Sequence, residues 1–187
     1  MKFKKINLQS VTSTNDIAIS LIKKNEKKPS IIVANVQRKG RGTRGKKWIS
    51  KKGNIFMSIF FKINEKKINF RQFSLINPYI IRFVLKKYSK HKIKIKWPND
   101  LLVKGRKICG ILQEVIEFEE KKYLVIGIGV NTKIAPNSKQ FKSISLLECS
   151  NYPINNRNII KNISNVYEKL LNRMKKKNIL DLRKKYV

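Results

Sequence analysis

The chain has 187 residues, of which 41% are hydrophobic and 9% aromatic, which excludes a disordered chain and leaves no room for two large domains. Its 44 basic and 11 acidic residues give a formal net charge of +33, which raises nucleic acid or an anionic surface as a partner. Lysines occur in every segment without a block or stripe, however, so codon bias toward Lys, Asn and Ile explains the excess about equally well.

The first half of the chain alternates helical and strand patterns. After a short strand-like start, Ser13 or Thr14 caps a helix whose apolar face includes Ile17 and Leu21. An apolar, aromatic-rich run further along predicts a strand, and the run after it has helical spacing despite Pro78. The predicted elements are a helix near residues 14–25, strands over 30–36 and 54–63, a loop over 37–47, and a helix over 70–88.

The second half is mostly strands, with one helix at its end. Alternating apolar and basic residues predict a strand over 93–97, which Pro98 ends because it cannot donate to the ladder. Segments 101–103 and 108–115 flank a turn at Lys104, Gly105 and Arg106, which predicts a hairpin. A strand over 123–130 and a Lys-rich helix over 156–176 follow. We therefore expect one α/β or α+β domain over residues 1–187, with a mixed central sheet and flanking helices.

The cysteines and the histidine of the chain indicate its cellular compartment and restrict the types of catalytic or metal site it can form. Cys109 and Cys149 lack CxxC spacing, which argues for a reduced, cytoplasmic protein. His91 is the only histidine, so a Ser-His-Asp triad or a multi-histidine metal site is not expected. No signal peptide and no apolar run of about 18 residues is present, so we expect no membrane association.

The glycine-rich segment QRKGRGTRGKKW, residues 37–48, is the first that suggests chemistry. Its glycines let backbone N–H groups approach an anion, and Arg41 and Arg44 supply positive charge. Phosphate or carboxylate binding and a plain solvated loop both fit this composition. The spacing is not that of a Walker loop. Trp48 either stacks on a base or anchors the loop to the core.

The second segment, KWPNDLLVKGRKICGILQE, covers residues 96–114. Asp100 stands where a strand breaks and Lys107 follows on the neighbouring hairpin arm, so cross-strand pairing can bring both into one cleft. A carboxylate can hold Mg²⁺ or accept an amine proton, and a lysine can bridge a carboxylate and a phosphate. An ordinary hairpin with a surface lysine is the alternative. Gly110 fits either a bulge or the close approach of a ligand.

The third segment, VIGIGVNT, covers residues 125–132. Gly127 and Gly129 weaken a strand unless something approaches its backbone, and a flat ligand lying there would account for them. Asn131 either reads an adenine edge or closes a turn at the strand end.

Together and in this order, these segments resemble the catalytic domain of biotin–protein ligases, within the wider biotin and lipoate ligase superfamily. The resemblance covers about residues 10–150 and rests on STND (Ser13–Asp16), GRGTRG (Gly40–Gly45), KWPND (Lys96–Asp100), GRKICGIL (Gly105–Leu112) and GIGVN (Gly127–Asn131). It implies a fold like that of class II aminoacyl-tRNA synthetases. It also implies a ligase that makes biotinyl-5′-AMP from ATP and biotin and transfers biotin to a lysine of an acceptor, such as the biotin carboxyl carrier protein of acetyl-CoA carboxylase.

The resemblance assigns roles to individual residues. It places at biotin Ser13, Thr14, Asn15, Gln37, Gly40, Arg41, Gly42, Thr43, Lys107 and Gly110. It places at ATP or the adenylate Arg41, Arg44, Trp48, Asn99, Lys107 and Asn131. Catalysis is expected from Lys107, Arg41 and Asp100, with Asp100 also a candidate Mg²⁺ ligand or acceptor of the amine proton. Arg41 is expected to hold the biotin carboxylate and ATP phosphates in a loop that closes over the adenylate.

The sequence departs from the family pattern in three places. Thr43 stands where some members have Arg, which predicts the loss of one contact that retains the adenylate. No helix-turn-helix domain precedes the motifs, so we expect a ligase that does not bind DNA. A homodimer is a further possibility. Residues 151–187 form a Lys-rich tail in which the small C-terminal β-barrel of many relatives is not found.

Two other functions compete with this interpretation. A lipoate ligase or octanoyltransferase shares the fold, and the latter would use a reactive Cys-Lys pair. Strand alternation predicts Lys107 and Cys109 on one face, which keeps that possibility open. A basic nucleic-acid-binding module would instead concentrate its charge on one face and bind with steep salt dependence.

Overall fold

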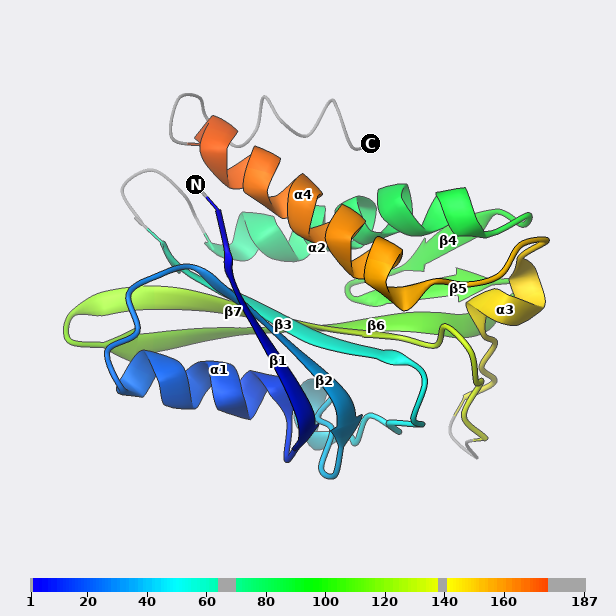
Figure 1. The fold of residues 1–187 in the computed structure, drawn as a ribbon. Helices are drawn as coiled ribbons and strands as arrows, with labels where there is room; N and C mark the ends of the chain where they lie inside the picture. The colour runs from blue at the N-terminus through cyan, green and yellow to red at the C-terminus, as the bar shows by residue number, and fades with distance from the viewer. Residues whose placement is uncertain (1, 64–69, 138–140, 175–187) are drawn as a thin grey trace.

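The computed structural model describes residues 2–63, 70–137 and 141–174. Within them, seven strands form one sheet in the order β1-β2-β3-β7-β6-β5-β4 (Figure 1). The strands are β1 (Lys4–Val11), β2 (Ser30–Gln37), β3 (Ile55–Ile63), β4 (Ile93–Lys96), β5 (Asp100–Val103), β6 (Arg106–Phe118) and β7 (Lys121–Val130). The helices are α1 (Thr14–Lys23), α2 (Phe70–Leu85), α3 (Leu146–Cys149) and α4 (Asn156–Met174).

The sheet is mixed, as predicted. β1 and β2 pair in parallel and every other neighbouring pair is antiparallel. A parallel pair needs a crossover connection, and α1 provides it. β6 and β7 form the longest hairpin, closed by Glu119 and Glu120, which both have positive φ angles (46° and 57°) as a type I′ turn requires.

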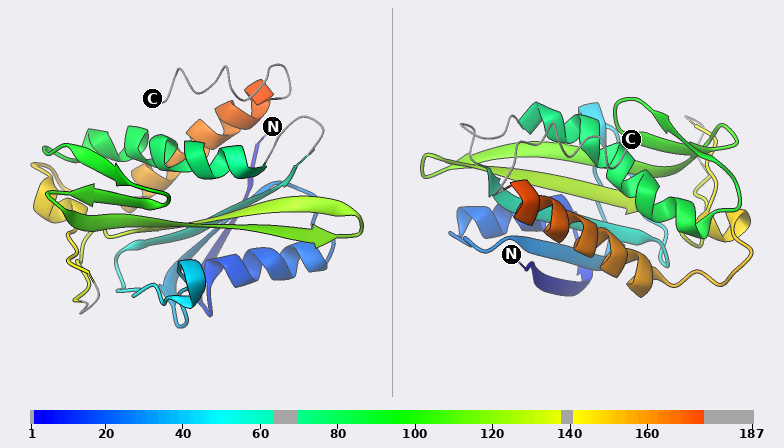
Figure 2. Two further views of the ribbon diagram at one scale, coloured as in Figure 1. Left: turned by 180° about the vertical axis from the view of Figure 1, so that it is seen from behind. Right: turned by 90° about the horizontal axis from the view of Figure 1, so that it is seen from above.

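Helices cover both faces of the sheet in three layers (Figures 1 and 2). α1 lies on one face, and α2 and α4 lie together on the other. On the first face, Ala18 and Ile22 of α1 pack with Ile32, Phe60 and Val125 of the sheet. The opposite face carries the larger core, in which apolar residues of α2 and α4 pack against β3, β6 and β7. This arrangement is the predicted α/β fold.

The α1 face of the sheet is only partly covered by the helix. Continuing the alternation of β3 and β7 past Phe60 and Val125, the next residues on this face are Ser58, Gly127 and Gly129. Ser58 has a small side chain and the two glycines have none, so side chains from other elements can approach the sheet beside the N-terminal end of α1. The candidate site lies there.

The predicted elements are confirmed, with changed ends. α1 ends at Lys23, β6 continues to Phe118 rather than residue 115, and α2 is followed by a 3-10 turn at Lys86–Tyr88. α4 begins at Asn156 as predicted, while predicted helical residues 175–176 lie outside the described residues. None of the helices that the structure describes is long and apolar enough to cross a membrane.

Candidate functional site

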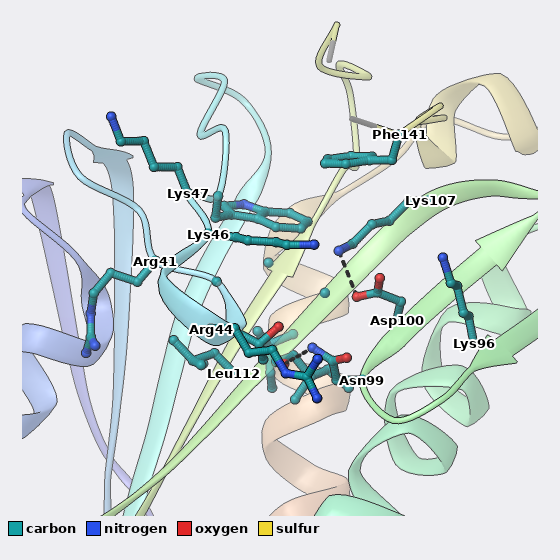
Figure 3. A pocket seen from close by; sticks show the side chains of 18 of the residues that line it. Arg41, Arg44, Lys46, Lys47, Lys96, Asn99, Asp100, Lys107, Leu112 and Phe141 are labelled. Atoms are coloured by element: carbon teal, nitrogen blue, oxygen red, sulfur yellow. Dashed lines mark hydrogen bonds and ion pairs between the residues drawn. The ribbon is translucent and has the colours of Figure 1, made fainter. Parts of the chain in front are cut away.

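A cavity of about 860 Å³ lies between the N-terminal end of α1, the glycine-rich loop, the β4–β5 turn, β6 and β7 (Figure 3). This volume suits a small-molecule site. The predicted site residues that line it are Ser13, Thr14, Asn15, Gln37, Arg41, Gly42, Thr43, Arg44, Trp48, Asn99, Asp100, Lys107 and Gly110. The predicted residues Gly40 and Asn131 do not line it. Segments far apart in sequence therefore converge on one cavity.

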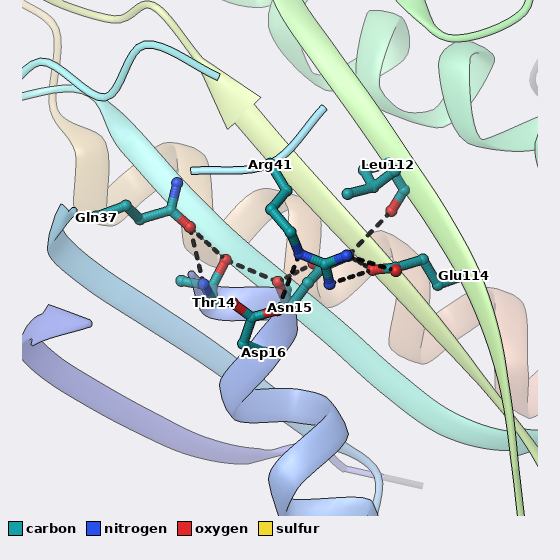
Figure 4. Close-up of polar contacts among 8 residues, drawn as sticks. Thr14, Asn15, Asp16, Gln37, Arg41, Leu112 and Glu114 are labelled. Carbon is teal, nitrogen blue, oxygen red and sulfur yellow. Dashed lines mark hydrogen bonds and ion pairs between the residues drawn. The ribbon is translucent and has the colours of Figure 1, made fainter. Parts of the chain in front are cut away.

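The end of the cavity beside α1 is lined by neutral polar side chains and by Arg41, whose charge is paired with Asp16 and Glu114 (Figure 4). Gln37 Oε1 accepts hydrogen bonds from the backbone N–H of Thr14 at 2.8 Å and from its hydroxyl at 3.1 Å. Ser58 Oγ lies 2.8 Å from Thr14 Oγ1 and also donates to Asn15 Oδ1. Thr14, Asn15 and Ser58 are buried, so these hydrogen bonds hold their side chains in place.

Gly127 and Gly129 make room for side chains of the protein itself. A Cβ added at Gly127 would lie 2.4 Å from Asn15 Oδ1, and one at Gly129 would lie 2.4 Å from the indole of Trp48. A Cβ at Gly110 would also meet that indole, at 2.7 Å. Asn15 and Trp48 therefore account for the absence of side chains at these two positions. Both glycines also belong to the cavity lining, so a flat ligand over them stays a prediction.

The opposite end of the cavity is cationic. Lys107 Nζ lies 2.7 Å from Asp100 Oδ1, which confirms that the two share one cleft. The ammonium also lies over the rings of Trp48 and Phe141, 5.4 and 5.1 Å from their centroids. Further cations on the lining are Arg44, Lys46, Lys47, Lys96 and Lys142. This end can bind a group with several negative charges.

A β-bulge directs Lys107 into the cavity. Leu101 pairs with Cys109 but Leu102 pairs with Lys107, so Ile108 is an extra residue on β6. The bulge breaks the alternation, and the prediction that Lys107 and Cys109 share a face is wrong. Cys109 is buried in the core on the α2 side, and burial raises the pKa of its thiol. Such a thiol is a poor nucleophile.

Backbone hydrogen bonds fix Lys107 from both sides. Its N–H donates to the carbonyl of Lys142, and its carbonyl accepts from the N–H of Ile144. The Asn131 side chain also donates to the Lys107 carbonyl, at 3.3 Å. Asn131 is fully buried, so its geometry matches the turn-closing alternative better than an adenine contact. Asn99 lines the cavity, and its amide donates to the carbonyl of Ile111 at 3.0 Å.

Arg41 is held by two carboxylates. Its terminal nitrogens lie 2.9 and 2.8 Å from the two oxygens of Glu114, and its Nε lies 2.9 Å from Asp16 (Figure 4). A bidentate pair of this kind is geometrically specific. Three of its five N–H groups are used in these pairs, so a biotin carboxylate or ATP phosphates could contact the guanidinium through the two N–H groups that remain on its terminal nitrogens.

Ser58, Glu114 and Phe141 are among the residues at the site that were not predicted from the sequence. Ser58 looks like one small residue in an apolar strand, although alternation with Phe60 could have placed it on the α1 face. Glu114 ends the quoted second segment and carries no motif signal of its own. Phe141 follows residues with no pattern, so nothing in the sequence indicates that its ring meets Lys107.

The described residues offer little to a metal ion on their own. No group of three or more His, Cys, Asp or Glu side chains among them could hold one. Asp100 is the only acidic residue on the described cavity lining. Because Mg²⁺ is commonly bound through one or two carboxylates together with substrate phosphates, this lining fits Mg²⁺ only as a companion of a phosphate ligand.

Comparison with known proteins identifies relatives of the chain. A model of the biotin/lipoate A/B protein ligase family matches residues 7–131. The bifunctional ligase/repressor BirA of Escherichia coli (strain K12) is 34% identical over 126 residues, which are 66% of this chain and 39% of that protein. The bifunctional ligase/repressor BirA of Bacillus subtilis (strain 168) is 30% identical over 165 residues, 85% of this chain and 51% of that protein. The chain thus spans about half or less of these curated relatives.

A solved structure has the same architecture over nearly the whole chain. The biotin protein ligase from Aquifex aeolicus in complex with biotin and ATP superposes with a TM-score of 0.79 at 26% identity. The match covers 98% of this chain and 76% of that one.

Proposed function

Because the chain belongs to the biotin/lipoate A/B protein ligase family, we propose that it is an ATP-dependent biotin–protein ligase. The observation that carries the proposal is the chemical difference between the two ends of one cavity. A neutral polar end at Thr14 and Asn15 suits the ureido ring of biotin, and a cationic end at Lys107 suits ATP phosphates. The biotin carboxylate and the α-phosphate then meet between the two ends.

The first half-reaction joins biotin to AMP. A biotin carboxylate oxygen attacks the α-phosphorus, the bond to the β-phosphate oxygen breaks, and pyrophosphate leaves. Negative charge grows on the α-phosphate oxygens, and the ammonium of Lys107 stabilises it from a fixed position. Arg44 and Lys46 add charge at the same end. When bound with ATP, Mg²⁺ neutralises phosphate charge, and Asp100 is the carboxylate that would hold it.

The second half-reaction transfers biotin to the acceptor. The lysine amine of the acceptor attacks the carbonyl of the mixed anhydride, an amide forms and AMP leaves with the bonding electrons. The amine must lose a proton, and Asp100 is the group on the lining that can accept it. The loop carrying Gly42 and Thr43 lines the cavity. By closing over the adenylate, it would limit hydrolysis of the anhydride by water.

The biological setting follows from the same proposal. The acceptor is the biotin carboxyl carrier protein of acetyl-CoA carboxylase, and the compartment is the cytoplasm. Cys109 and Cys149 are both free and buried, which suits a reducing compartment. A homodimer without DNA binding is part of the proposal, and sedimentation of the purified chain tests the dimer.

Exchange of labelled pyrophosphate into ATP tests the first half-reaction. We expect exchange that requires biotin and falls roughly 100-fold or more in Lys107→Ala, because one fixed charge next to the α-phosphate is lost. His91→Ala, which changes a residue that does not line the cavity, is the control and should exchange like the wild type. Exchange with lipoate or octanoate but not with biotin would assign the chain to the other branch of the family.

A further inference from the structure

We propose that Glu114 is a positioning residue that joins the biotin end of the cavity to the glycine-rich loop. The inference rests on the proposed function for the identity of the ligand, biotin. The positioning role itself rests on the geometry of four side chains. These are Asp16, Asn15, Glu114 and Arg41, called here the Arg41 clamp (Figure 4).

Glu114 contacts both Asn15 and Arg41 with its one carboxylate. Its Oε2 accepts from Asn15 Nδ2 at 2.7 Å and lies 2.8 Å from an Arg41 terminal nitrogen, while Oε1 lies 2.9 Å from the other. Asn15 is buried on the cavity floor, whereas Arg41 belongs to the loop. One side chain on β6, a strand paired on both sides, therefore sets the position of Asn15 on the floor and of the loop.

The amide of Asn15 has one orientation because two acceptors face its nitrogen, the Glu114 carboxylate at 2.7 Å and the Leu112 carbonyl at 3.5 Å. Glu114 requires its nitrogen on the β6 side, which leaves its oxygen toward the hydroxyl of Ser58. The Ser58 oxygen in turn lies against Thr14 Oγ1. Loss of the Glu114 charge would weaken the shorter of the two contacts to the amide nitrogen and leave the longer one to Leu112. The donor and acceptor pattern offered to a ureido ring would then be held less firmly.

Asp16 completes the attachment of the loop. It accepts from Arg41 Nε at 2.9 Å and comes from the first turn of α1, beside Asn15. The guanidinium thus uses three nitrogens on two carboxylates, one from α1 and one from β6. In this arrangement Arg41 acts by holding the loop over the biotin end, and the charge on the phosphates is left to Lys107 and its cationic neighbours.

The test compares Glu114→Gln with Glu117→Gln, an exposed carboxamide substitution on the same strand outside the cavity. We expect Glu114→Gln to raise the KM for biotin roughly tenfold, the size of a lost charged hydrogen bond, with kcat within about twofold of the wild type. Glu117→Gln should change neither. A fall in kcat at unchanged KM, or equal effects of the two variants, would overturn the proposal.

A double-mutant cycle separates the clamp from a direct role of Arg41. If the clamp is correct, Arg41→Ala raises the biotin KM like Glu114→Gln, and the double variant adds no more than about twofold. Asp16→Asn, which removes one partner at the surface, should give a smaller rise in the same direction. If Arg41 instead neutralises the phosphates, Arg41→Ala lowers kcat by roughly 100-fold and its effect adds to that of Glu114→Gln.

Tryptic cleavage of the loop tests the clamp without any ligase activity. The Arg44–Gly45 bond lies in the loop, and mass spectrometry can follow its cleavage in the native protein. We expect several-fold faster cleavage in Glu114→Gln than in Glu117→Gln, at equal urea midpoints for unfolding. Equal cleavage rates would refute the clamp, whereas faster cleavage in a chain that shows no biotin-dependent exchange would retain the clamp and reject the proposed function.

Discussion

The position of Trp48 depends on the absence of side chains at two glycines of the sheet beneath it. Its indole lies over two glycines from adjacent strands, Gly110 and Gly129, which pair directly. The ring forms one wall of the cavity and lies next to the Lys107 ammonium. A flat ring at this place suits stacking on adenine. The two interpretations of Trp48 in the sequence, loop anchor and nucleotide contact, are thus compatible in one side chain.

A methyl group at Gly129 should displace this ring. The Cβ of Gly129→Ala would lie 2.4 Å from the indole, so we expect a loss of about 1–3 kcal/mol in the free energy of unfolding and a higher KM for ATP. Gly53→Ala is the control, because Gly53 does not line the cavity and its Cβ would lie no nearer than 3.6 Å to a neighbour, although its φ of +97° makes the change cost about 1 kcal/mol. Urea unfolding and ATP kinetics would show this difference. An unchanged KM for ATP in Gly129→Ala would contradict a role of Trp48 at the nucleotide.

Prediction from sequence succeeds at the residue level where the relation is local. Asp100 and Lys107 flank a short turn, so strand pairing brought them together as expected. Prediction fails where the position of a residue depends on packing between distant segments. The bulge at Ile108 cannot be seen in an alternation pattern, and the neighbours of Gly127 and Gly129 come from α1 and the loop, far away in the chain. The ion pairs of Arg41 depend on three segments, which explains why its surroundings were not anticipated.

At the level of elements, a buried hydrogen bond adds to the core packing that attaches α4 to the rest of the molecule. The Tyr167 hydroxyl donates to Asn77 Oδ1 of α2 at 2.9 Å, and Asn77 Nδ2 donates to Gln113 of β6 at 2.9 Å. Tyr167 is fully buried, and burial raises the pKa of its phenol. The hydroxyl therefore stays protonated and remains a donor. This chain of hydrogen bonds connects both helices of the layer to the strand that carries Glu114.

Tyr167→Phe should destabilise the fold without touching the cavity. It leaves Asn77 Oδ1 buried without its donor, so we expect a loss of about 1–3 kcal/mol in the free energy of unfolding. Tyr152→Phe removes a hydroxyl from a side chain that is 77% exposed and should stay within about 0.5 kcal/mol of the wild type. Urea denaturation measures both. Equal stabilities of the two variants would mean that the hydrogen bond between α4 and α2 contributes nothing.

Element prediction worked because most segments have strong periodic patterns. The apolar run of β3 and the amphipathic faces of α1, α2 and α4 identified these elements from sequence alone. The end of β6 was missed because Glu117 and its neighbours look like a polar turn, while pairing with β7 continues the strand to Phe118. α3 has only four residues, too few for a periodic pattern, and a Ser145–Glu148 capping box defines it.

For the whole molecule, the distribution of charge is more informative than the net charge of +33. The cavity lining itself separates a cationic end from a polar end. We expect the KM for ATP to rise more steeply with KCl concentration than the KM for biotin, because ATP carries more charge and binds at the cationic end. Steady-state kinetics at several salt concentrations checks this. Parallel rises for the two substrates would contradict the assignment of the two ends.

Covalent transfer of biotin to a purified carrier domain tests the central claim most directly. The chain is incubated with ATP, Mg²⁺, biotin and the biotin carboxyl carrier domain, and the intact mass of the carrier is measured. We predict the addition of one biotinyl group that requires ATP and is absent when the acceptor lysine is replaced by arginine. A carrier whose mass stays unchanged, while a known biotin–protein ligase labels the same preparation, would contradict the account.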